Sequence, residues 1–459
     1  MTDSFCRSPE GHGADRTEEA REIPAGVRAE GRITPPSSKS FSHRYLTLAF
    51  LSGAPLTVEQ PLDAEDIDLF FRALAAAGFQ VRHSGDGGGH AQASIQPGTP
   101  PPAATLYCGN AGTMARFLTA AATAVPGEWT VDGTPRLRER PVGPLVDAVR
   151  QLGGEVEYRG REGFLPVRLG GGSLRGGFAR LDAGESSQYL SALLMAALAA
   201  PEPTELEVAA LTSEPYVVIT RRVIEAFGGR VEEVKNGRLR IEPGIEPPGR
   251  VRVEADYSAA CYPAAAAALS GGDVHLVGLA TDSPQGDRAF FALLEKMGAQ
   301  LEAFVGQSGT LVSRGWRVSG SGALTAVEAD LSSMPDQVPT LAALAPFARG
   351  VTRITGVPHL RIKESDRLAA MARELARVGA EVEEKEDGLV IPGVWAEAEP
   401  PTEAVTTHSY DDHRIAMAMA LVGLRRPGIR VGEPGVVAKS YPGFWEDLDV
   451  LTGRAKQEG

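Results

Sequence analysis

Basic side chains near the starts of helical stretches are the residues of this chain whose types and spacing could do chemistry. Four or five of the six polar helix starts have a Lys or Arg within one turn, and the basic candidates are Lys39, Arg44, Arg116, Arg140, Lys363, Arg367, Arg414 and Lys439. A helix N-terminus has unpaired N–H groups and the positive end of the helix dipole, so it favours anions. One anion takes about two charge-assisted partners. The set therefore indicates two phosphorylated or carboxylated substrates that bind together.

Taken alone, most of these motifs have an ordinary explanation. Lys363 and Arg367 are spaced as in a solvated i,i+4 charge cluster on a helix. Ser186, with two polar residues after it, is a good helix cap. Arg414 is different, because a cation in the first turn opposes the helix dipole, so we expect a carboxylate or a charged ligand to hold it. Asp336 could cap the fifth repeat's helix or act as a base.

The motifs belong to an internal repeat that recurs about every 75 residues along the chain. In each copy a polar segment runs into an Ala/Leu-rich helix, and a second helix then ends on a glycine. These glycines are Gly78, Gly153, Gly228, Gly298, Gly379 and Gly453. The first helix is apolar on all sides and is predicted to be buried, whereas the second is amphipathic. Each unit reads as strand, buried helix, strand, surface helix, strand, and three units would make one domain of an α/β protein.

Length and composition limit the class of protein. A chain of 459 residues is too long for one core, and the repeats divide it into two halves near residue 254. The net charge of −13 argues against nucleic acid as a partner. Any anion site must then be a local basic cleft in an acidic protein. Three scattered cysteines, with no CxxC pair, indicate neither disulfides nor zinc.

The chain shows no signal for a membrane or for secretion. No apolar run reaches the roughly 18 residues that a membrane span needs. The N-terminal segment mixes Asp, Glu and Arg without the apolar stretch of a secretory signal. We therefore expect a cytoplasmic protein, without a membrane partner, whose residues 1–24 form a disordered tail.

Taken together, the motifs resemble the signatures of one enzyme family. They are Ser38-Lys39-Ser40 with Arg44, Gly109-Asn110-Ala111-Gly112-Thr113 with Arg116, Glu139-Arg140-Pro141, Ser186-Ser187-Gln188, Lys363-Glu364-Ser365-Asp366-Arg367-Leu368 and Asp412-His413-Arg414. In this order, over roughly residues 25–455, the chain resembles the 5-enolpyruvylshikimate-3-phosphate synthases (3-phosphoshikimate 1-carboxyvinyltransferases) of the enolpyruvyl transferase family. The resemblance implies a two-domain inside-out α/β barrel with six βαβαββ repeats, three per domain. It also implies domains of residues 38–254 and of residues 25–37 plus 255–459, with two crossings of the chain between them.

The resemblance also implies a reaction. The enolpyruvyl group of phosphoenolpyruvate would pass to the 5-hydroxyl of shikimate 3-phosphate, by addition and elimination through a tetrahedral intermediate, with release of phosphate. Such chemistry needs a base, an acid and cations that stabilise the anions. Asp336 would be the base, and Lys39 and Glu364 would share the proton transfers. No metal and no organic cofactor are expected, the partners are the two small-molecule substrates, and a monomer is expected.

The family's binding residues carry over position by position. Shikimate 3-phosphate would be held by Lys39, Ser40, Arg44, Ser186, Ser187, Gln188, Ser213, Tyr216, Asp336, His359 and Lys363. Phosphoenolpyruvate would be held by Lys39, Asn110, Gly112, Arg140, Gln188, Arg367, Arg414 and Lys439. Two positions depart from the family's pattern: His359 stands where many relatives have asparagine, and Phe117 where proline is commoner.

Two alternatives remain open at this point. The first is the sister enolpyruvyl transferase that acts on UDP-N-acetylglucosamine. Its proton-donating loop cysteine would fall within residues 132–141, which contain none, and it lacks the Lys-Glu-Ser-Asp-Arg helix. The second is a non-catalytic ligand-binding relative with the same fold. The presence of Lys39, Asp336 and Glu364 argues against that alternative.

Overall fold

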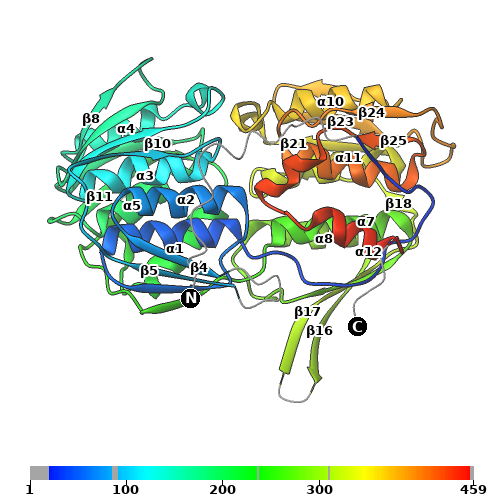
Figure 1. Cartoon of the computed structure of the whole chain (residues 1–459). Helices are drawn as coiled ribbons and strands as arrows, with labels where there is room; N and C mark the ends of the chain where they lie inside the picture. The colour runs from blue at the N-terminus through cyan, green and yellow to red at the C-terminus, as the bar shows by residue number, and fades with distance from the viewer. Residues whose placement is uncertain (1–19, 85–90, 235–236, 309–310, 455–459) are drawn as a thin grey trace.

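The computed structural model of the chain describes residues 20–84, 91–234, 237–308 and 311–454, which form two lobes joined side by side (Figure 1). Each lobe has its own hydrophobic core. One core is built from residues between 41 and 253, and the other from residues 23–33 together with residues between 257 and 451. Within the described ranges, no helix is both long and apolar enough to cross a membrane.

Three buried helices form the centre of each lobe. They are α1 (Lys39–Ser52), α3 (Gly112–Ala124) and α5 (Ser187–Ala197) in the first lobe, and α7 (Tyr257–Ser270), α9 (Val338–Leu344) and α11 (His413–Arg425) in the second. Their alanine-rich sequences let neighbouring helices approach closely, and α3 packs on α5 as α11 packs on α7 and α9. The prediction that the first helix of each repeat is buried is confirmed.

The second helix of each repeat lies outside this centre. These helices are α2 (Glu65–Ala76), α4 (Gly143–Gln151), α6 (Pro215–Ala226), α8 (Ala289–Lys296), α10 (Arg367–Arg377) and α12 (Phe444–Leu451). The six glycines singled out in the sequence follow them with φ between 73° and 110°. A side chain is disfavoured at such angles, which explains why glycine ends these helices.

The described residues form seven sheets, and five of them share one pairing pattern. The five are β14 (Arg250–Arg252)-β3 (Leu56–Glu59)-β5 (Gln92–Gln96)-β4 (Gln80–Ser84), β6 (Ala103–Tyr107)-β7 (Gly127–Asp132)-β9 (Val167–Gly171)-β8 (Glu155–Tyr158), β10 (Gly177–Ala183)-β11 (Thr204–Leu211)-β13 (Arg238–Ile241)-β12 (Val231–Val234), β16 (Gln300–Ser308)-β17 (Leu311–Ser319)-β15 (Asp273–Val277)-β2 (Glu30–Ile33) and β19 (Glu328–Asp330)-β21 (Val351–Thr355)-β23 (Gly388–Pro392)-β22 (Glu383–Lys385). In each of the five, one edge strand pairs in parallel with its neighbour, and the other two pairings are antiparallel. The sixth sheet is β1 (Arg21–Glu22)-β25 (Ile429–Val431)-β24 (Val405–Thr407), and β18 (Leu324–Thr325) pairs with β20 (Ala348–Arg349). The repeated pattern agrees with the predicted α/β architecture of six units.

Two strands are exchanged between the lobes. β2 precedes α1 of the first lobe but pairs in parallel with β15 of the second. β14 precedes α7 of the second lobe but pairs in parallel with β3 of the first. The chain therefore passes twice between the lobes, and the two passages meet at the β-bridge of Ser37 with Ala255. Because α1 and α7 begin directly after these passages, their N-terminal ends lie together at the junction.

The predicted disordered tail of residues 1–24 is wrong for residues 20–24. Arg21 and Glu22 form β1, which pairs antiparallel with β25. Ile23 is buried at 3 % exposure, and its backbone N–H donates to the carbonyl of Ile429 at 3.0 Å. The free edge of β25 and the apolar contact of Ile23 hold this segment, although its charged sequence gives no strand signal. The rest of the predicted tail, residues 1–19, lies outside the described residues.

Candidate active site

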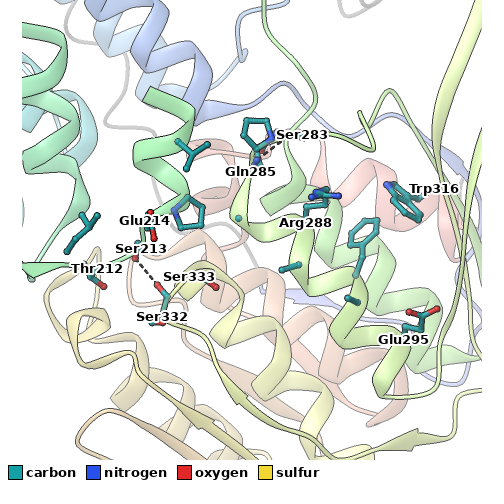
Figure 2. Close-up of a pocket in the computed structure, with 18 of the residues that line it drawn as sticks. Thr212, Ser213, Glu214, Ser283, Gln285, Arg288, Glu295, Trp316, Ser332 and Ser333 are labelled. Atoms are coloured by element: carbon teal, nitrogen blue, oxygen red, sulfur yellow. Dashed lines mark hydrogen bonds between the residues drawn. The ribbon is translucent and has the colours of Figure 1, made fainter. Parts of the chain in front are cut away.

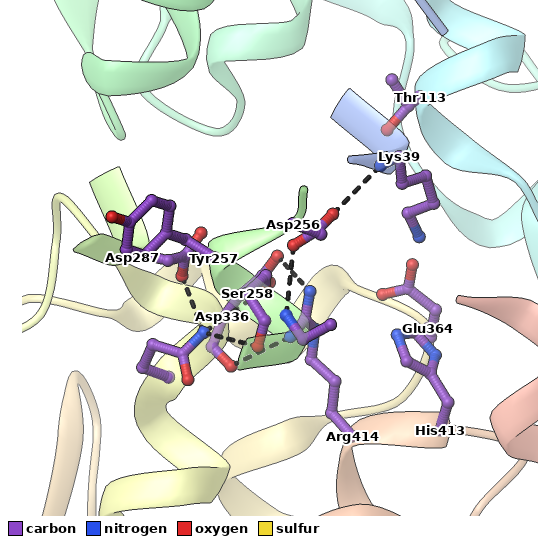
Figure 3. Close-up of polar contacts among 12 residues, drawn as sticks. Lys39, Thr113, Asp256, Tyr257, Ser258, Asp287, Asp336, Glu364, His413 and Arg414 are labelled. Carbon is purple, nitrogen blue, oxygen red and sulfur yellow. Dashed lines mark hydrogen bonds and ion pairs between the residues drawn. The ribbon is translucent and has the colours of Figure 1, made fainter. Parts of the chain in front are cut away.

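The polar ends of the inner helices meet between the lobes (Figure 3). Asp256 is the N-cap of α7 and accepts from the backbone N–H of Ala259 at 3.1 Å. Its other carboxylate oxygen accepts from the backbone N–H of Lys39, the first residue of α1, at 3.0 Å. One carboxylate thus stabilises helix ends in both lobes. Ser186 and Asp412 cap α5 and α11 in the same way, as their sequence positions predict.

Arg367 holds three carboxylates together. This residue begins α10 and is 1 % exposed. Its guanidinium donates to Asp412 Oδ2 at 2.8 Å, to Asp336 Oδ1 at 2.8 Å and to Glu364 Oε2 at 2.9 Å. Burial alone would lower the pKa of Arg367, but the three carboxylates outweigh burial and raise it. The side chain is therefore a permanent cation with fixed geometry.

Asp336 lies between two arginines. It belongs to the short 3-10 turn Pro335–Gln337 and does not cap a helix with its side chain. Besides Arg367, Arg414 donates to its Oδ2 at 2.7 Å and the Tyr216 hydroxyl donates to the same oxygen at 3.1 Å. Burial would raise the pKa of Asp336, but Arg414 and Arg367 hold it well below its usual value. The carboxylate that the first-turn Arg414 was predicted to need is thus Asp336.

Glu364 has a similar electrostatic environment on the other side of Arg367. Its Oε2 accepts from Arg367, and its Oε1 lies 3.8 Å from the Arg140 guanidinium of the first lobe. Burial would raise the pKa of Glu364, but Arg367 and Arg140 lower it well below its usual value. Asp336 and Glu364 are therefore both held in the ionised form by cations.

Two lysines face the same space. Lys39 Nζ donates to Asp66 Oδ2 at 3.2 Å, and Asp66 is only 3 % exposed. Lys363 lies in the irregular segment before α10. Burial, reinforced by Arg116, lowers the pKa of Lys363 to about 8. Its ammonium group therefore titrates just above neutral pH, and a nearby phosphate would favour its charged form.

The first lobe contributes a second set of cations. Arg116 donates to Gln188 Oε1 at 2.6 Å, and Gln188 Nε2 donates to Thr113 Oγ1 at 2.8 Å, so the amide is fixed in one orientation. Arg140 is 2 % exposed and donates to the carbonyl of Asn110 at 3.2 Å. A Cβ built on Gly112 would lie 2.4 Å from Nη2 of Arg140, so this glycine leaves the room that the guanidinium occupies.

Arg44 is held almost entirely by its own lobe. Its guanidinium donates to Thr220 Oγ1 at 2.7 Å, to the carbonyl of Ser40 at 2.8 Å and to the carbonyl of Tyr216 at 2.8 Å. It also lies 5.2 Å from the ring centre of Phe117, which is fully buried. The unusual phenylalanine thus supports Arg44 through a cation–π contact.

Most of the predicted site residues line one cavity. Those that do are Lys39, Ser40, Arg44, Arg140, Ser186, Ser187, Gln188, Ser213, Tyr216, Asp336, Lys363, Glu364, Arg367 and Arg414. The other predicted residues lie beside it: Gly112 contacts Arg140, Lys439 Nζ donates to the carbonyl of Asn110 at 3.3 Å, and His359 Nδ1 lies 3.5 Å from Thr212 Oγ1. Burial, with Lys363, lowers the pKa of His359 to about 4, so His359 is neutral near pH 7.

This cavity is small, at about 60 Å³. Sites for small molecules usually measure about 300–1,000 Å³. A cavity of this size is too small to hold two small-molecule substrates. A larger cavity of about 1,000 Å³ lies nearby, between the start of α6 and the helix α8 (Figure 2). Its charged lining residues are Glu214, Glu295 and Arg288, so it lacks the excess of cations that two anionic substrates require.

Sequence reasoning missed several carboxylates of this site. Asp66 positions Lys39, Asp412 positions Arg367, and Asp256 links α1 with α7. Asp287 accepts from Gln337 Nε2 at 2.8 Å, and burial, with the nearby Asp336, raises its pKa to about 7. An acid at a helix start reads as a cap or as a dipole partner, so the side chains that pair with these carboxylates had no separate signal in the sequence.

Comparison with known proteins finds one family that matches most of the chain. The sequence model of the family described as EPSP synthase (3-phosphoshikimate 1-carboxyvinyltransferase) matches residues 23–448. The chain is 42% identical over 417 residues to the 3-phosphoshikimate 1-carboxyvinyltransferase of Methanoculleus marisnigri, covering 90% of this chain and 94% of the relative. It is 40% identical over 434 residues to that of Vibrio cholerae, covering 92% and 97%.

A solved structure with a similar fold is EPSP synthase from Acinetobacter baumannii. It superposes with a TM-score of 0.75 and 28% sequence identity, over 94% of this chain and 97% of the other.

Proposed function

Since the chain belongs to the EPSP synthase (3-phosphoshikimate 1-carboxyvinyltransferase) family, we propose that the cleft between its lobes carries out that family's reaction with the groups described above. The activity transfers the enolpyruvyl group of phosphoenolpyruvate to the 5-hydroxyl of shikimate 3-phosphate and releases phosphate, in the shikimate pathway. The observation that supports the site assignment most strongly is the convergence of cations from both lobes on Asp336 and Glu364.

In the addition step, Asp336 takes the proton of the 5-hydroxyl while that oxygen attacks C2 of phosphoenolpyruvate. Glu364 delivers a proton to the methylene carbon, and Lys39 takes part in the transfers. In the elimination step the methyl group returns a proton, the double bond re-forms and phosphate leaves. Cations at the phosphate and the carboxylate stabilise the charge that moves onto them.

The depressed pKa values make this chemistry depend on substrate binding. Arg414 and Arg367 keep Asp336 a weak base, and Arg367 and Arg140 keep Glu364 ionised. The anionic groups of the substrates compete for these same guanidinium groups. As each arginine turns to a substrate anion, the pKa values of Asp336 and Glu364 rise toward the range in which a carboxyl group exchanges protons near neutral pH.

Each of the two substrates draws its binding residues from both lobes. Shikimate 3-phosphate contacts the cap of α5, Lys363 and the segment around Ser213 and Tyr216. Phosphoenolpyruvate contacts Gly112, Arg140, Arg367, Arg414 and Lys439, which come from both lobes. The second substrate therefore binds where closure brings the lobes together.

We propose that the two lobes act as domains, residues 38–254 and residues 25–37 plus 255–459, that separate to admit substrate and close on it. The small cavity and the hydrogen bond from the Ser213 hydroxyl to the carbonyl of Ser332 at 3.1 Å support this, because both belong to a closed cleft. A monomer in the cytoplasm remains a prediction of the sequence.

An assay of phosphate release tests the function. We expect release from phosphoenolpyruvate only when shikimate 3-phosphate is present, and no release when UDP-N-acetylglucosamine replaces it as the acceptor. Release with the sugar nucleotide, but not with shikimate 3-phosphate, would show that the sister reaction is the true one.

A further inference from the structure

Arg136 crosses from the first lobe to the segment of the second lobe that carries Lys363 and Glu364. It stands at the start of the 3-10 turn Leu137–Glu139, after β7. Its Nε donates to the carbonyl of Glu364 at 3.1 Å, and its Nη2 donates to the carbonyl of Lys363 at 2.9 Å. The remaining nitrogen, Nη1, donates to Glu139 Oε2 at 2.8 Å. All three nitrogens are therefore in use, and two of them reach the other lobe.

The two carbonyl groups lie where the chain has no regular structure. Residues 363–366 connect the 3-10 helix Pro358–Ile362 with α10, so neither helix includes the carbonyl groups of Lys363 and Glu364. A buried or half-buried backbone carbonyl needs a donor. The fork of the Arg136 guanidinium supplies a donor for each, which fixes the orientation of both peptide groups relative to the first lobe.

The side chains on these peptide groups are the ones that face the substrate cavity. Lys363 and Glu364 both line it, and Glu364 is positioned there by Arg367 at 2.9 Å and by Arg140 at 3.8 Å. A rotation of either peptide group would move its side chain. Since a displacement of about 1 Å in a preorganised site can cost about 100-fold in rate, the placement of this segment matters for turnover.

We infer that Arg136 is a positioning residue, which aligns Glu364 and Lys363 for the reaction only when the lobes are closed. Arg136 is not among the residues that line the cavity and so acts through the backbone. This inference rests on the proposed function of the cleft. The inference adds a second consequence of closure. When the first lobe closes onto the second, the hydrogen bonds of Arg136 align Glu364, and the binding site is completed at the same time.

Arg138 provides a matched control on the same turn. It is also a partly exposed arginine, but its guanidinium donates to both carboxylate oxygens of Asp132, at 2.8 and 2.7 Å, within its own lobe. Substitutions at both positions remove one surface guanidinium from the same turn. Only the change at Arg136 removes hydrogen bonds between the lobes.

The test compares Arg136→Ala, Arg136→Lys and Arg138→Ala by steady-state kinetics, thermal melting and calorimetric binding of shikimate 3-phosphate alone. Charge-assisted hydrogen bonds at a partly exposed site predict a loss of about 10- to 100-fold in kcat for Arg136→Ala. Arg136→Lys should recover little, because an ammonium group cannot serve both carbonyl groups in a fixed fork. The melting temperature should match that of Arg138→Ala. Binding of shikimate 3-phosphate should fall less than kcat does, because Lys363 is one of several groups that hold it.

Three results would overturn the inference. One is a kcat for Arg136→Ala within about twofold of that of Arg138→Ala. Another is a rise in KM for phosphoenolpyruvate with kcat unchanged, which would mean that Arg136 only stabilises closure. The third is a parallel fall in melting temperature and in shikimate 3-phosphate binding, which would mark a structural role. An inactive wild-type protein would instead refute the proposed function, so the two failures are distinguishable.

Discussion

Substitution of Gly112 by alanine tests the geometry of the proposed phosphoenolpyruvate site directly. Gly112 is the first residue of α3, and its backbone does not require glycine, since it is absent from the residues with positive φ. A Cβ there would lie 2.4 Å from Nη2, 2.5 Å from Cζ and 2.7 Å from Nη1 of Arg140. Ordinary van der Waals contact begins near 3.4 Å, so the guanidinium must retreat by about 1 Å.

The size of the effect of Gly112→Ala on stability and on KM depends on how the Arg140 guanidinium is displaced. The displaced atoms are the end of a flexible side chain, so the free energy of unfolding should change little. Arg140 is nevertheless almost fully buried and donates to the carbonyl of Asn110, so it cannot move without changing the site. A shift of about 1 Å in such a site predicts a rise of about 10- to 100-fold in KM for phosphoenolpyruvate. Binding of shikimate 3-phosphate, whose predicted contacts lie elsewhere, should stay near the wild-type value.

The assay is steady-state phosphate release, with phosphoenolpyruvate varied at saturating shikimate 3-phosphate. Gly143→Ala is the control, because Gly143 is also the first residue of its helix, α4, and the nearest atom to an added Cβ is 3.4 Å away. We expect the control to behave as wild type. If Gly112→Ala keeps KM within twofold of wild type, Arg140 is not the group that limits this site, and the reasoning fails.

Three further predictions concern charge and closure. Asp336→Ala should lower kcat by about 10²–10⁴-fold and tighten phosphoenolpyruvate binding, because Arg367 and Arg414 lose a competing carboxylate; unchanged turnover would contradict the base assignment. Since the Lys363 pKa is lowered to about 8 by burial, and binding of a phosphate favours its charged form, affinity for shikimate 3-phosphate should fall by about twofold from pH 7 to pH 8 and more steeply above pH 8. Calorimetry should find this decline absent in Lys363→Arg. Because the closed cavity of about 60 Å³ is too small for the substrates, X-ray scattering should show compaction toward a radius of gyration of about 23 Å when shikimate 3-phosphate is added; an unchanged radius would argue against closure.

Much of the fold could be predicted from local sequence features. The all-apolar helices such as residues 257–270 had to be buried, and the glycines after the outer helices marked their ends, because both properties are local. Strand β1 could not be predicted in this way. Its two residues are charged, and it is held by the free edge of β25, which is about 400 residues away in the sequence.

In the candidate site, too, local features could be predicted from the sequence and long-range contacts could not. The cations could be predicted because their helix-start positions and the family resemblance mark each one separately. Their partners could not, since Asp66, Asp256 and Asp412 read as ordinary helix-start acids. Arg136 had even less signal, because its targets are backbone carbonyl groups about 230 residues away. A carbonyl group is common to every residue and leaves no mark in a sequence.

The arginines that we propose as substrate ligands also lower the pKa values of Asp336 and Glu364, the two carboxylates that we propose as base and acid. Arg414 and Arg367 lower the pKa of Asp336, which makes it a weak base. Arg367 and Arg140 lower the pKa of Glu364, which leaves it without the proton that the proposed acid must donate. Substrate anions that draw these arginines away release both carboxylates at once. Substrate binding and the rise in the pKa values of Asp336 and Glu364 are then coupled. Substitution of one of these arginines, such as Arg414, should therefore alter both the affinity for phosphoenolpyruvate and the pH dependence of kcat. A variant Arg414→Ala that raises KM for phosphoenolpyruvate but leaves the pH profile of kcat unchanged would separate the two and contradict this coupling.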